Sequence, residues 1–139
     1  MKKRKQENPI EEVSDYMSSP VITIPETNTI KDAAEFMHEK QVGSLVVVNG
    51  KKPVGIVTET DFARKVVAKG LDPKTAKVGD IMTTPLQTID CHESVLDANK
   101  LMAKKKIRHL VVMDKEELVG IVTVHNLVHY FSNPRIRTF

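Results

Sequence analysis

Asp61 is the residue whose type and position point most directly to chemistry. It follows Thr58 by three positions, where an apolar β-branched run gives way to a helical pattern, so its carboxylate could reach into a cleft. An ionised carboxylate can accept hydrogen bonds from both adjacent hydroxyls of a ribose, and each charge-assisted bond contributes about 1.5 to 3 kcal/mol. The same Thr-x-x-Asp spacing also forms a helix capping box, as at Thr29 and Asp32. A cap need not exclude a ligand, so both roles stay open.

Phosphate binding would need cations, and the pair Arg108-His109 at the start of a later apolar run supplies two. His125 is a further candidate, in a loop expected to face the same ligand. The alternatives are a solvated arginine and a hydrogen-bonded histidine at a sheet edge. These three residues are the candidate phosphate ligands.

Two further pairs could carry chemistry, but each lacks the partners that its chemistry needs. His125 and His129 are four positions apart on a predicted helix and could share a metal, yet no third ligand is evident. Cys91-His92 could suggest a nucleophile, yet no glycine-rich elbow or oxyanion loop accompanies it. No Walker loop or dinucleotide fingerprint is present. We therefore expect ligand binding without catalysis, with no catalytic residue, no metal and no required cofactor.

Composition narrows the class of protein. The 139 residues leave room for one domain, and a hydrophobic fraction of 40% with only 4% aromatic residues predicts a core of Val, Ile, Leu, Ala and Met. A net charge of +3 is too small to indicate nucleic acid by itself. The single cysteine excludes an internal disulfide and fits a reducing cytoplasm. No stretch has the length and apolarity of a membrane span, and no signal peptide is evident.

The candidate residues lie in a segment that occurs twice in the chain, as an internal repeat. Residues 13 to 62 recur sixty-five positions later without insertion or deletion. Matching residues include Val13 and Val78, Met17 and Met82, Pro20 and Pro85, Met37 and Met102, and the runs Gly55-Ile56-Val57-Thr58 and Gly120-Ile121-Val122-Thr123. A fixed period predicts one supersecondary unit made twice, with each copy burying a face against the other. Clefts between such copies are places where small ligands bind.

Each copy is predicted to run β-α-β-β-α. A short alternating strand precedes a capped helix with an apolar stripe, and two apolar runs and a last helix follow. Asn49-Gly50 between the first two apolar runs predicts a hairpin. The expected elements are strands 21–24, 44–48 and 54–58 with helices after Thr29 and over 60–69 in the first copy, and strands 86–89, 109–113 and 118–123 with helices after Ser94 and over 124–131 in the second.

The repeats also divide the chain. The expected organisation is a basic and polar tail over 1–12, a first repeat over 13–69, a linker over 70–77, a second repeat over 78–131 and a C-terminal tail over 132–139. The basic run Lys2-Lys3-Arg4-Lys5 is interpreted as a solvated terminus. Nucleic-acid binding through this run is not expected; as an alternative function it would show steep salt dependence.

In order and spacing, these motifs resemble the CBS-domain pair, also called a Bateman module. The resemblance covers residues 13 to 131. It is carried by the Met-x-x-Pro openings at Met17 and Met82, the Asp-Ala helices at Asp32 and Asp97, and the run Gly55-Ile56-Val57-Thr58-x-x-Asp61. It implies an α+β fold of two tandem β-α-β-β-α repeats packed with pseudo-twofold symmetry. It also implies a stand-alone, non-enzymatic sensor that binds AMP, ADP or ATP between the repeats and signals to a partner protein by conformational change, with S-adenosylmethionine as the alternative ligand.

The resemblance also implies roles for residues. It places the ribose on Thr58 and Asp61, the adenine against Ile56 and the backbone of Thr83, Leu86 and Gln87, and the phosphates on Arg108, His109 and His125. The second copy has Asn126 where the first has Asp61, and an amide binds hydroxyls without charge assistance. We therefore expect an asymmetric module with one tight nucleotide site per chain.

Modules of this kind usually associate as a disc, so a homodimer is expected. Apolar residues of the two last helices would form that interface or would instead complete the internal core: Val124, Leu127, Val128 and Phe131, with Phe62, Val66 and Val67. A different class of function also stays open, a structural or dimerisation module with vestigial clefts. The sequence identifies neither the adenosine ligand nor the effector protein.

Overall fold

The computed structural model describes residues 11–132, which fall into two units. One unit consists of residues 21–87 and is called the Asp61 unit. The other consists of residues 11–20 together with 88–132 and is called the Asn126 unit. The basic run at residues 2–5 lies outside the described residues. Each unit is an α+β structure, as the sequence predicts, and its three strands form one mixed sheet.

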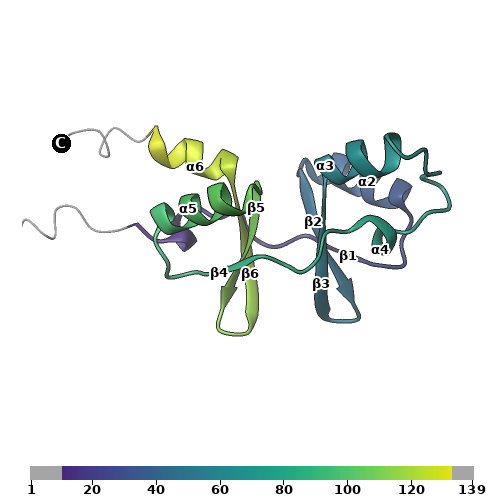
Figure 1. The fold of residues 1–139 in the computed structure, drawn as a ribbon. Coiled ribbons are helices and arrows are strands. Elements are labelled where there is room, and N and C mark those ends of the chain that lie inside the picture. Colours follow the sequence, from purple (N-terminus) through teal and green to yellow (C-terminus); the bar gives the residue numbers. More distant parts are fainter. Residues whose placement is uncertain (1–10, 133–139) are drawn as a thin grey trace, which may run out of the picture. The chain divides into compact units, whose positions relative to one another are not determined.

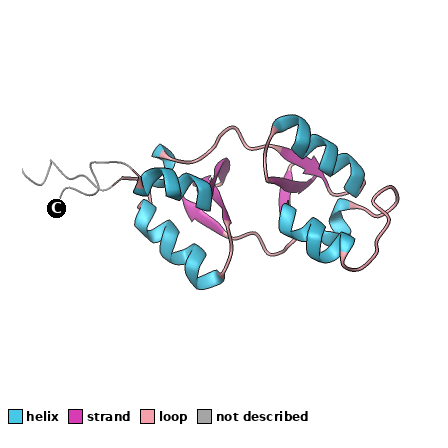
Figure 2. Cartoon of the chain, turned by 90° about the horizontal axis from the view of Figure 1, so that it is seen from above, coloured by secondary structure: helices cyan, strands magenta, loops and turns pink. Residues whose placement is uncertain are grey.

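The Asp61 unit is built around the sheet β1-β2-β3. Strand β1 is Thr23–Pro25, β2 is Ser44–Asn49 and β3 is Lys52–Thr58. Helix α2, Ile30–Lys40, connects β1 to β2, and a parallel pair needs such a crossover. Strands β2 and β3 form an antiparallel hairpin. Helices cover one face of this sheet (Figures 1 and 2).

The Asn126 unit repeats this plan. Its elements are β4 (Thr88–Asp90), α5 (Val95–Lys105), β5 (His109–Asp114), β6 (Glu117–Thr123) and α6 (Val124–Phe131). Thr88 pairs with Val111 as Thr23 pairs with Val46, so both sheets have the same register. The predicted order β-α-β-β-α is therefore confirmed in both copies.

The opening strands begin later than predicted. The sequence predicted strands from Val21 and Leu86, but β1 starts at Thr23 and β4 at Thr88. The physical reason is register, since regular parallel pairing with β2 begins only at Thr23. Ile22 nevertheless accepts a hydrogen bond from the Val46 amide at 3.0 Å.

Both hairpins close with a two-residue turn that needs a positive φ. In the Asp61 unit Asn49 pairs with Lys52, so the turn is Gly50-Lys51 and lies one residue later than the predicted Asn-Gly centre. Gly50 has a φ of 65°, which glycine adopts without steric cost. The equivalent residue of the other hairpin is Lys115, with a φ of 60°. The duplicated fold therefore keeps one turn geometry with two different residues.

The helices that follow the last strands differ between the units. In the Asp61 unit α3, Glu59–Asp61, continues into the π-helical segment η2, Phe62–Val67. The equivalent α6 is a regular α-helix over Val124–Phe131. The predicted helix over 60–69 is thus an α-turn followed by a π-helix, a conformation that is frequent at functional sites.

Each unit is completed by the opening segment of the other sequence repeat. The short helix α4, Val78–Ile81, belongs to the Asp61 unit, and the 3-10 turn η1, Val13–Asp15, belongs to the Asn126 unit. Thr83 forms a bridge with Ile56, and Ser18 forms the same bridge with Ile121. The units therefore do not coincide with the contiguous sequence repeats.

The repeated Met and Gly motifs meet at these bridges. A Cβ atom on Gly55 would lie 2.8 Å from Met82 Sδ, and one on Gly120 would lie 2.5 Å from Met17 Sδ. The backbone oxygens of Thr83 and Ser18 would also lie only 3.0 and 2.9 Å from these atoms, so glycine lets the Met segment lie close against the strand. This contact explains why the Met-x-x-Pro and Gly-Ile-Val-Thr motifs occur together.

Each unit has its own apolar core. Most buried residues are Val, Ile, Leu, Ala and Met, as composition predicts, with Cys91 and Tyr130 added in the Asn126 unit. Among residues 11–132, no helix is long and apolar enough to cross a membrane.

Candidate functional site

The carboxylate of Asp61 is the buried polar centre of the Asp61 unit, where the residue is only 4% exposed. Its Oδ1 atom accepts a hydrogen bond from Thr83 Oγ1 at 2.9 Å and lies 3.0 Å from Lys65 Nζ. Its Oδ2 atom accepts from the Thr58 amide at 2.9 Å and, more weakly, from Thr58 Oγ1 at 3.4 Å. Asp61 therefore caps the helix after β3, and it also contacts groups beyond its own turn.

Lys65 is a component of this site that the sequence analysis missed. Besides its ion pair with Asp61, its Nζ atom donates to the Ile81 carbonyl at 2.9 Å and lies 3.4 Å from Thr83 Oγ1. The signal was present in the sequence, because an acid followed four residues later by a base often forms an ion pair on a helix. Lys65 links the β3–α3 junction to the segment that ends in Thr83.

The four contacts fill the carboxylate, because two oxygens offer about four lone-pair positions. A ribose could bind only by replacing some of these partners. The Thr58 amide is fixed by the backbone, whereas Thr83 is exposed and the Lys65 side chain is 35% exposed. The two contacts on Oδ1 are therefore the replaceable ones, and a diol brings two hydroxyl donors.

The adenine residues predicted from the family lie in the same unit as Asp61. Ile56 and Thr83 exchange backbone hydrogen bonds of 3.1 and 2.8 Å, so the Thr83 segment runs beside β3. The structure thus brings Ile56, Thr58, Asp61 and Thr83 together. Leu86 and Gln87 follow on that segment and are half-buried.

The equivalent site in the Asn126 unit has the same backbone and different chemistry. Asn126 Oδ1 accepts from the Thr123 amide at 2.8 Å and from Thr123 Oγ1 at 3.0 Å, and its Nδ2 lies 3.4 Å from Ser18 Oγ. Tyr130 takes the place of Lys65, and its buried ring packs edge-on against Tyr16 with centroids 5.1 Å apart. This junction therefore contains an amide and an aromatic ring in place of an ion pair.

The predicted phosphate ligands all lie in the Asn126 unit. Arg108 precedes β5, and His109 is the first residue of β5, paired with Thr123. His125 was assigned both to a loop facing the ligand and to the helix predicted over 124–131; the structure places it in the first turn of α6, because Thr123 caps that helix. Their role toward a ligand of Asp61 stays a prediction.

Cys91 is unsuited to act as a nucleophile. It is 5% exposed, and burial raises the pKa of its thiol, with the carboxylates of Asp114 and Asp90 adding to the effect. A raised pKa keeps the thiol protonated near neutral pH, where the reactive form is the thiolate. Burial and the neighbouring carboxylates thus disfavour the reactive thiolate of Cys91.

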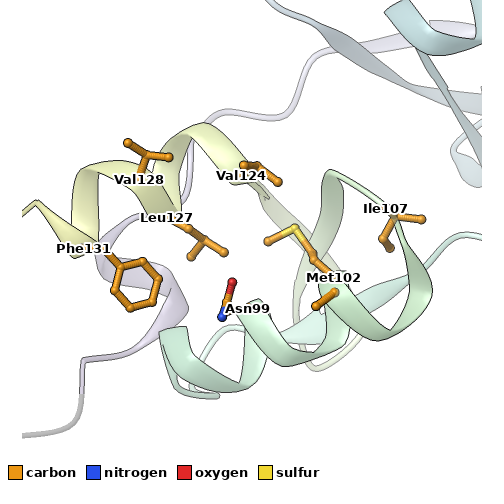
Figure 3. A pocket seen from close by; sticks show the side chains of 8 residues that line it. Asn99, Met102, Ile107, Val124, Leu127, Val128 and Phe131 are labelled. Carbon is orange, nitrogen blue, oxygen red and sulfur yellow. The ribbon is translucent and has the colours of Figure 1, made fainter.

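An apolar groove of about 290 Å³ lies between α5 and α6 (Figure 3). Met102 and Ile107 line it from the α5 side, and Val124, Val128 and Phe131 line it from α6. These three α6 residues are exposed, whereas Leu127 is buried in the core. In η2 of the Asp61 unit Val66 is buried and Val67 is exposed. The last helices therefore both complete the core and leave apolar side chains at the surface.

Comparison with known proteins gives the family. The model of the CBS domain matches residues 13–68 and 78–133. The chain is 37% identical over 122 residues to the CBS domain-containing protein YhcV of Bacillus subtilis, covering 87% of this chain and 86% of that protein. It is also 40% identical over 118 residues to an uncharacterised protein of Methanopyrus kandleri, covering 84% of this chain and 60% of the relative. The chain thus spans less than two thirds of that relative's length.

Two solved structures are similar across almost the whole chain. A hexameric CBS-CP12 protein from bloom-forming cyanobacteria has a TM-score of 0.82 and 33% identity, covering 91% of this chain and 77% of that one. The CBS domain pair of protein MJ0100, in complex with 5′-methylthioadenosine and S-adenosyl-L-methionine, has a TM-score of 0.79 and 31% identity, covering 89% and 98%. Together with the two matched segments, these likenesses show that the chain belongs to the CBS-domain family and carries the domain twice.

Proposed function

We propose that this CBS pair is a non-enzymatic regulatory module that binds an adenosine nucleotide, with the ribose held by Asp61. The observation that carries the proposal is the buried Asp61 carboxylate, whose Oδ1 contacts come from the replaceable groups of Thr83 and Lys65. The MJ0100 pair, a relative, is in complex with two adenosyl compounds, which supports this class of ligand.

Binding would exchange partners on one carboxylate oxygen. The ribose hydroxyls would take the positions of Thr83 Oγ1 and Lys65 Nζ on Oδ1, while the Thr58 amide would keep Oδ2 in place. The adenine would lie along the bridge between Ile56 and Thr83, where backbone groups can read its polar edge. The displaced Lys65 ammonium would then be available to pair with a negative group of the ligand, which favours an anionic adenosine compound such as AMP, ADP or ATP.

Regulation would follow from this exchange. A ligand shifts a conformational equilibrium only through its different affinities for two states. Lys65 ties η2 to the Ile81 carbonyl and to Thr83, so its displacement would loosen the contact between η2 and the segment after α4. We infer that an effector protein senses this change.

Titration calorimetry of the full chain with AMP, ADP, ATP and S-adenosylmethionine tests the proposal. One tight nucleotide site per chain is expected, and D61A should weaken it by about 2 to 4 kcal/mol, or thirty- to several-hundred-fold. The matched control is N126A, which should leave the tight site unchanged. Thermal melting of each variant shows whether it is folded. Unchanged affinity in folded D61A would remove Asp61 from the site.

A thermal shift separates the sensor from a module with vestigial clefts. A nucleotide at a hundred times its dissociation constant adds about 2.7 kcal/mol of stability to the folded state. A clear rise in melting temperature with AMP or ATP is therefore expected. No shift with any adenosine compound would favour the structural module.

We also propose that the chain associates with a second copy through its last helices. Val128 is 56% exposed and Val67 is 77% exposed. Val128 lies in α6, which follows β6, and Val67 lies in η2, which follows β3 and α3. A hexameric relative shows that this family can assemble through some surface. Light scattering coupled to size exclusion should give a dimer for the native chain and a smaller species for V128D and V67D. A native monomer at all concentrations would contradict this proposal.

A further inference from the structure

Cys91, His92 and Asp114 converge at one end of the Asn126 sheet. Cys91 and His92 follow β4, and Asp114 is the last residue of β5. These strands are parallel, so their carboxyl ends meet at the same edge, and the Cys91 amide donates to the Met113 carbonyl at 2.9 Å. One potential ligand atom from each of the three side chains lies within 4.8 Å of the other two.

The three donors have the chemistry of a transition-metal site. A thiolate, an imidazole and a carboxylate together are the ligand types of Zn²⁺, whereas Ca²⁺ and Mg²⁺ prefer oxygen alone. Bonds of about 2.0 to 2.3 Å in a tetrahedral site separate the ligand atoms by about 3.3 to 3.6 Å. The ligand atoms thus need to move by only about 1 Å, and His92 is an exposed side chain that can do so.

Glu12 is placed to orient the imidazole. Its Oε1 atom lies 3.0 Å from His92 Nδ1. A carboxylate on one ring nitrogen turns the other nitrogen outward and makes it a better metal ligand. The His92 amide also donates to Asp90 Oδ2 at 2.9 Å, which fixes the loop backbone. Glu12 is therefore a positioning residue for His92.

We propose that Cys91, His92 and Asp114 form a binding site for Zn²⁺ or a similar divalent transition metal, with His92 oriented by Glu12. The fourth position is left to water. The equivalent loop of the Asp61 unit has Glu26, Thr27 and Asn49 at the same repeat positions, so it offers neither sulfur nor imidazole. The chain thus contains its own negative control.

A metal here would fasten the N-terminal segment to the Asn126 unit. The Val13 amide donates to the Glu93 carbonyl at 2.8 Å, and the Ser14 amide donates to the Cys91 carbonyl at 3.1 Å. The segment that holds Glu12 therefore already runs along the metal loop. A metal that binds the folded chain and not the unfolded chain stabilises the folded state by mass action.

The test uses the full chain after dialysis against EDTA, titrated with Zn²⁺ and, for spectroscopy, with Co²⁺. One metal ion per chain is expected, with a thiolate-to-cobalt charge-transfer band in the near ultraviolet. C91S should abolish that band. Because Cys91 is buried and its variant could unfold, H92Q and D114N provide independent evidence, and each should weaken binding by about tenfold or more.

Two control variants test whether the loss of metal affinity is specific to the cluster. H129Q and H38Q remove histidines outside the cluster and should leave metal affinity unchanged. E12Q should weaken binding by about tenfold, less than C91S. The proposal is overturned if cobalt gives no thiolate band, or if folded H92Q and D114N bind metal as the native chain does. Because His92 lies outside the Asp61 unit, H92Q should bind nucleotide as the native chain does. Nucleotide titration of H92Q therefore tests the metal site separately from the proposed sensor function.

Discussion

The two units of this chain share one backbone and differ in charge at the same junction. After β3, Asp61 is buried and paired with Lys65, whereas after β6 the corresponding residues are Asn126 and Tyr130. At both junctions the Thr amide donates to the side-chain oxygen three residues later, and both keep the bridge to the opposite repeat's opening segment. The comparison separates the two roles of Thr-x-x-Asp: capping needs only an acceptor, so it survives the change to an amide. The ion pair is what distinguishes a candidate ligand site.

At the other end of each sheet, it is the Asn126 unit that has the distinctive side chains. The Asn126 unit has Cys91, His92 and Asp114 where the Asp61 unit has Glu26, Thr27 and Asn49. Each unit therefore contains one chemically distinctive cluster, at opposite ends of its strands. The two units thus share one scaffold and differ in side-chain chemistry at opposite ends of their strands.

Exchanging the acid and the amide should produce the largest change. D61N should lower nucleotide affinity at the tight site by about 1.5 to 3 kcal/mol, because the ribose loses charge assistance. N126D should strengthen a second site, although less, since Tyr130 supplies no cation there. Calorimetric stoichiometry measures both. Equal affinities in native protein and D61N would show that the two junctions do not differ in function.

Adding a side chain to either glycine at the Met contacts should destabilise the fold, by different amounts in the two units. G120A places a Cβ atom 2.5 Å from Met17 Sδ, and G55A places one 2.8 Å from Met82 Sδ. Each should cost about 1 to 3 kcal/mol of unfolding free energy, with G120A the more costly. Denaturant unfolding measures the loss, and M17A added to G120A should recover part of it. A neutral G120A would show that the segment can move away from β6.

Breaking the ion pair should destabilise the Asp61 junction moderately. K65M leaves the Asp61 carboxylate buried without its cation, which should cost about 1 to 2 kcal/mol of unfolding free energy, since the lysine is partly exposed. The control D61N/K65M removes both charges and should cost less. Thermal melts of the single and double variants give the coupling. Equal losses in both would mean that the pair contributes no stability.

The hairpin turns should give the smallest effects, of opposite sign. K115G should stabilise or leave unchanged the Asn126 unit, because Lys115 has a φ of 60° that glycine adopts freely. G50A should destabilise the Asp61 unit by about 1 kcal/mol for the same reason. Chemical denaturation distinguishes these outcomes. Destabilisation by K115G would point to a contact of the lysine side chain.

Local patterns were sufficient for much of the fold. The Thr29 and Ser94 caps, the apolar stripes and the hairpin spacing each depend on neighbouring residues, and both copies carried the same signals. The capping contact of Asp61 was also readable, since it spans one turn. The later start of β1 was not, because register with β2 depends on a partner more than twenty positions away.

The parts of the candidate sites that were not predicted depend on contacts between residues far apart in the sequence. The bond from Thr83 to Asp61 depends on which unit receives the opening segment, and no local pattern records that exchange. The position of Asp114 beside Cys91 depends on strand pairing in the same way. Lys65 is different, because its spacing from Asp61 was visible and only its significance was missed.

The exchanged opening segments also bear on how such a protein could arise and be made. A single repeat by itself lacks the opening segment that covers its β3 glycine in this structure, and a second copy would have to supply it. With two repeats in one chain, that exchange is intramolecular. During synthesis, residues 11–20 must wait for β6 to emerge from the ribosome before Met17 can pack on Gly120, whereas the Asp61 unit can close as soon as residue 87 is free.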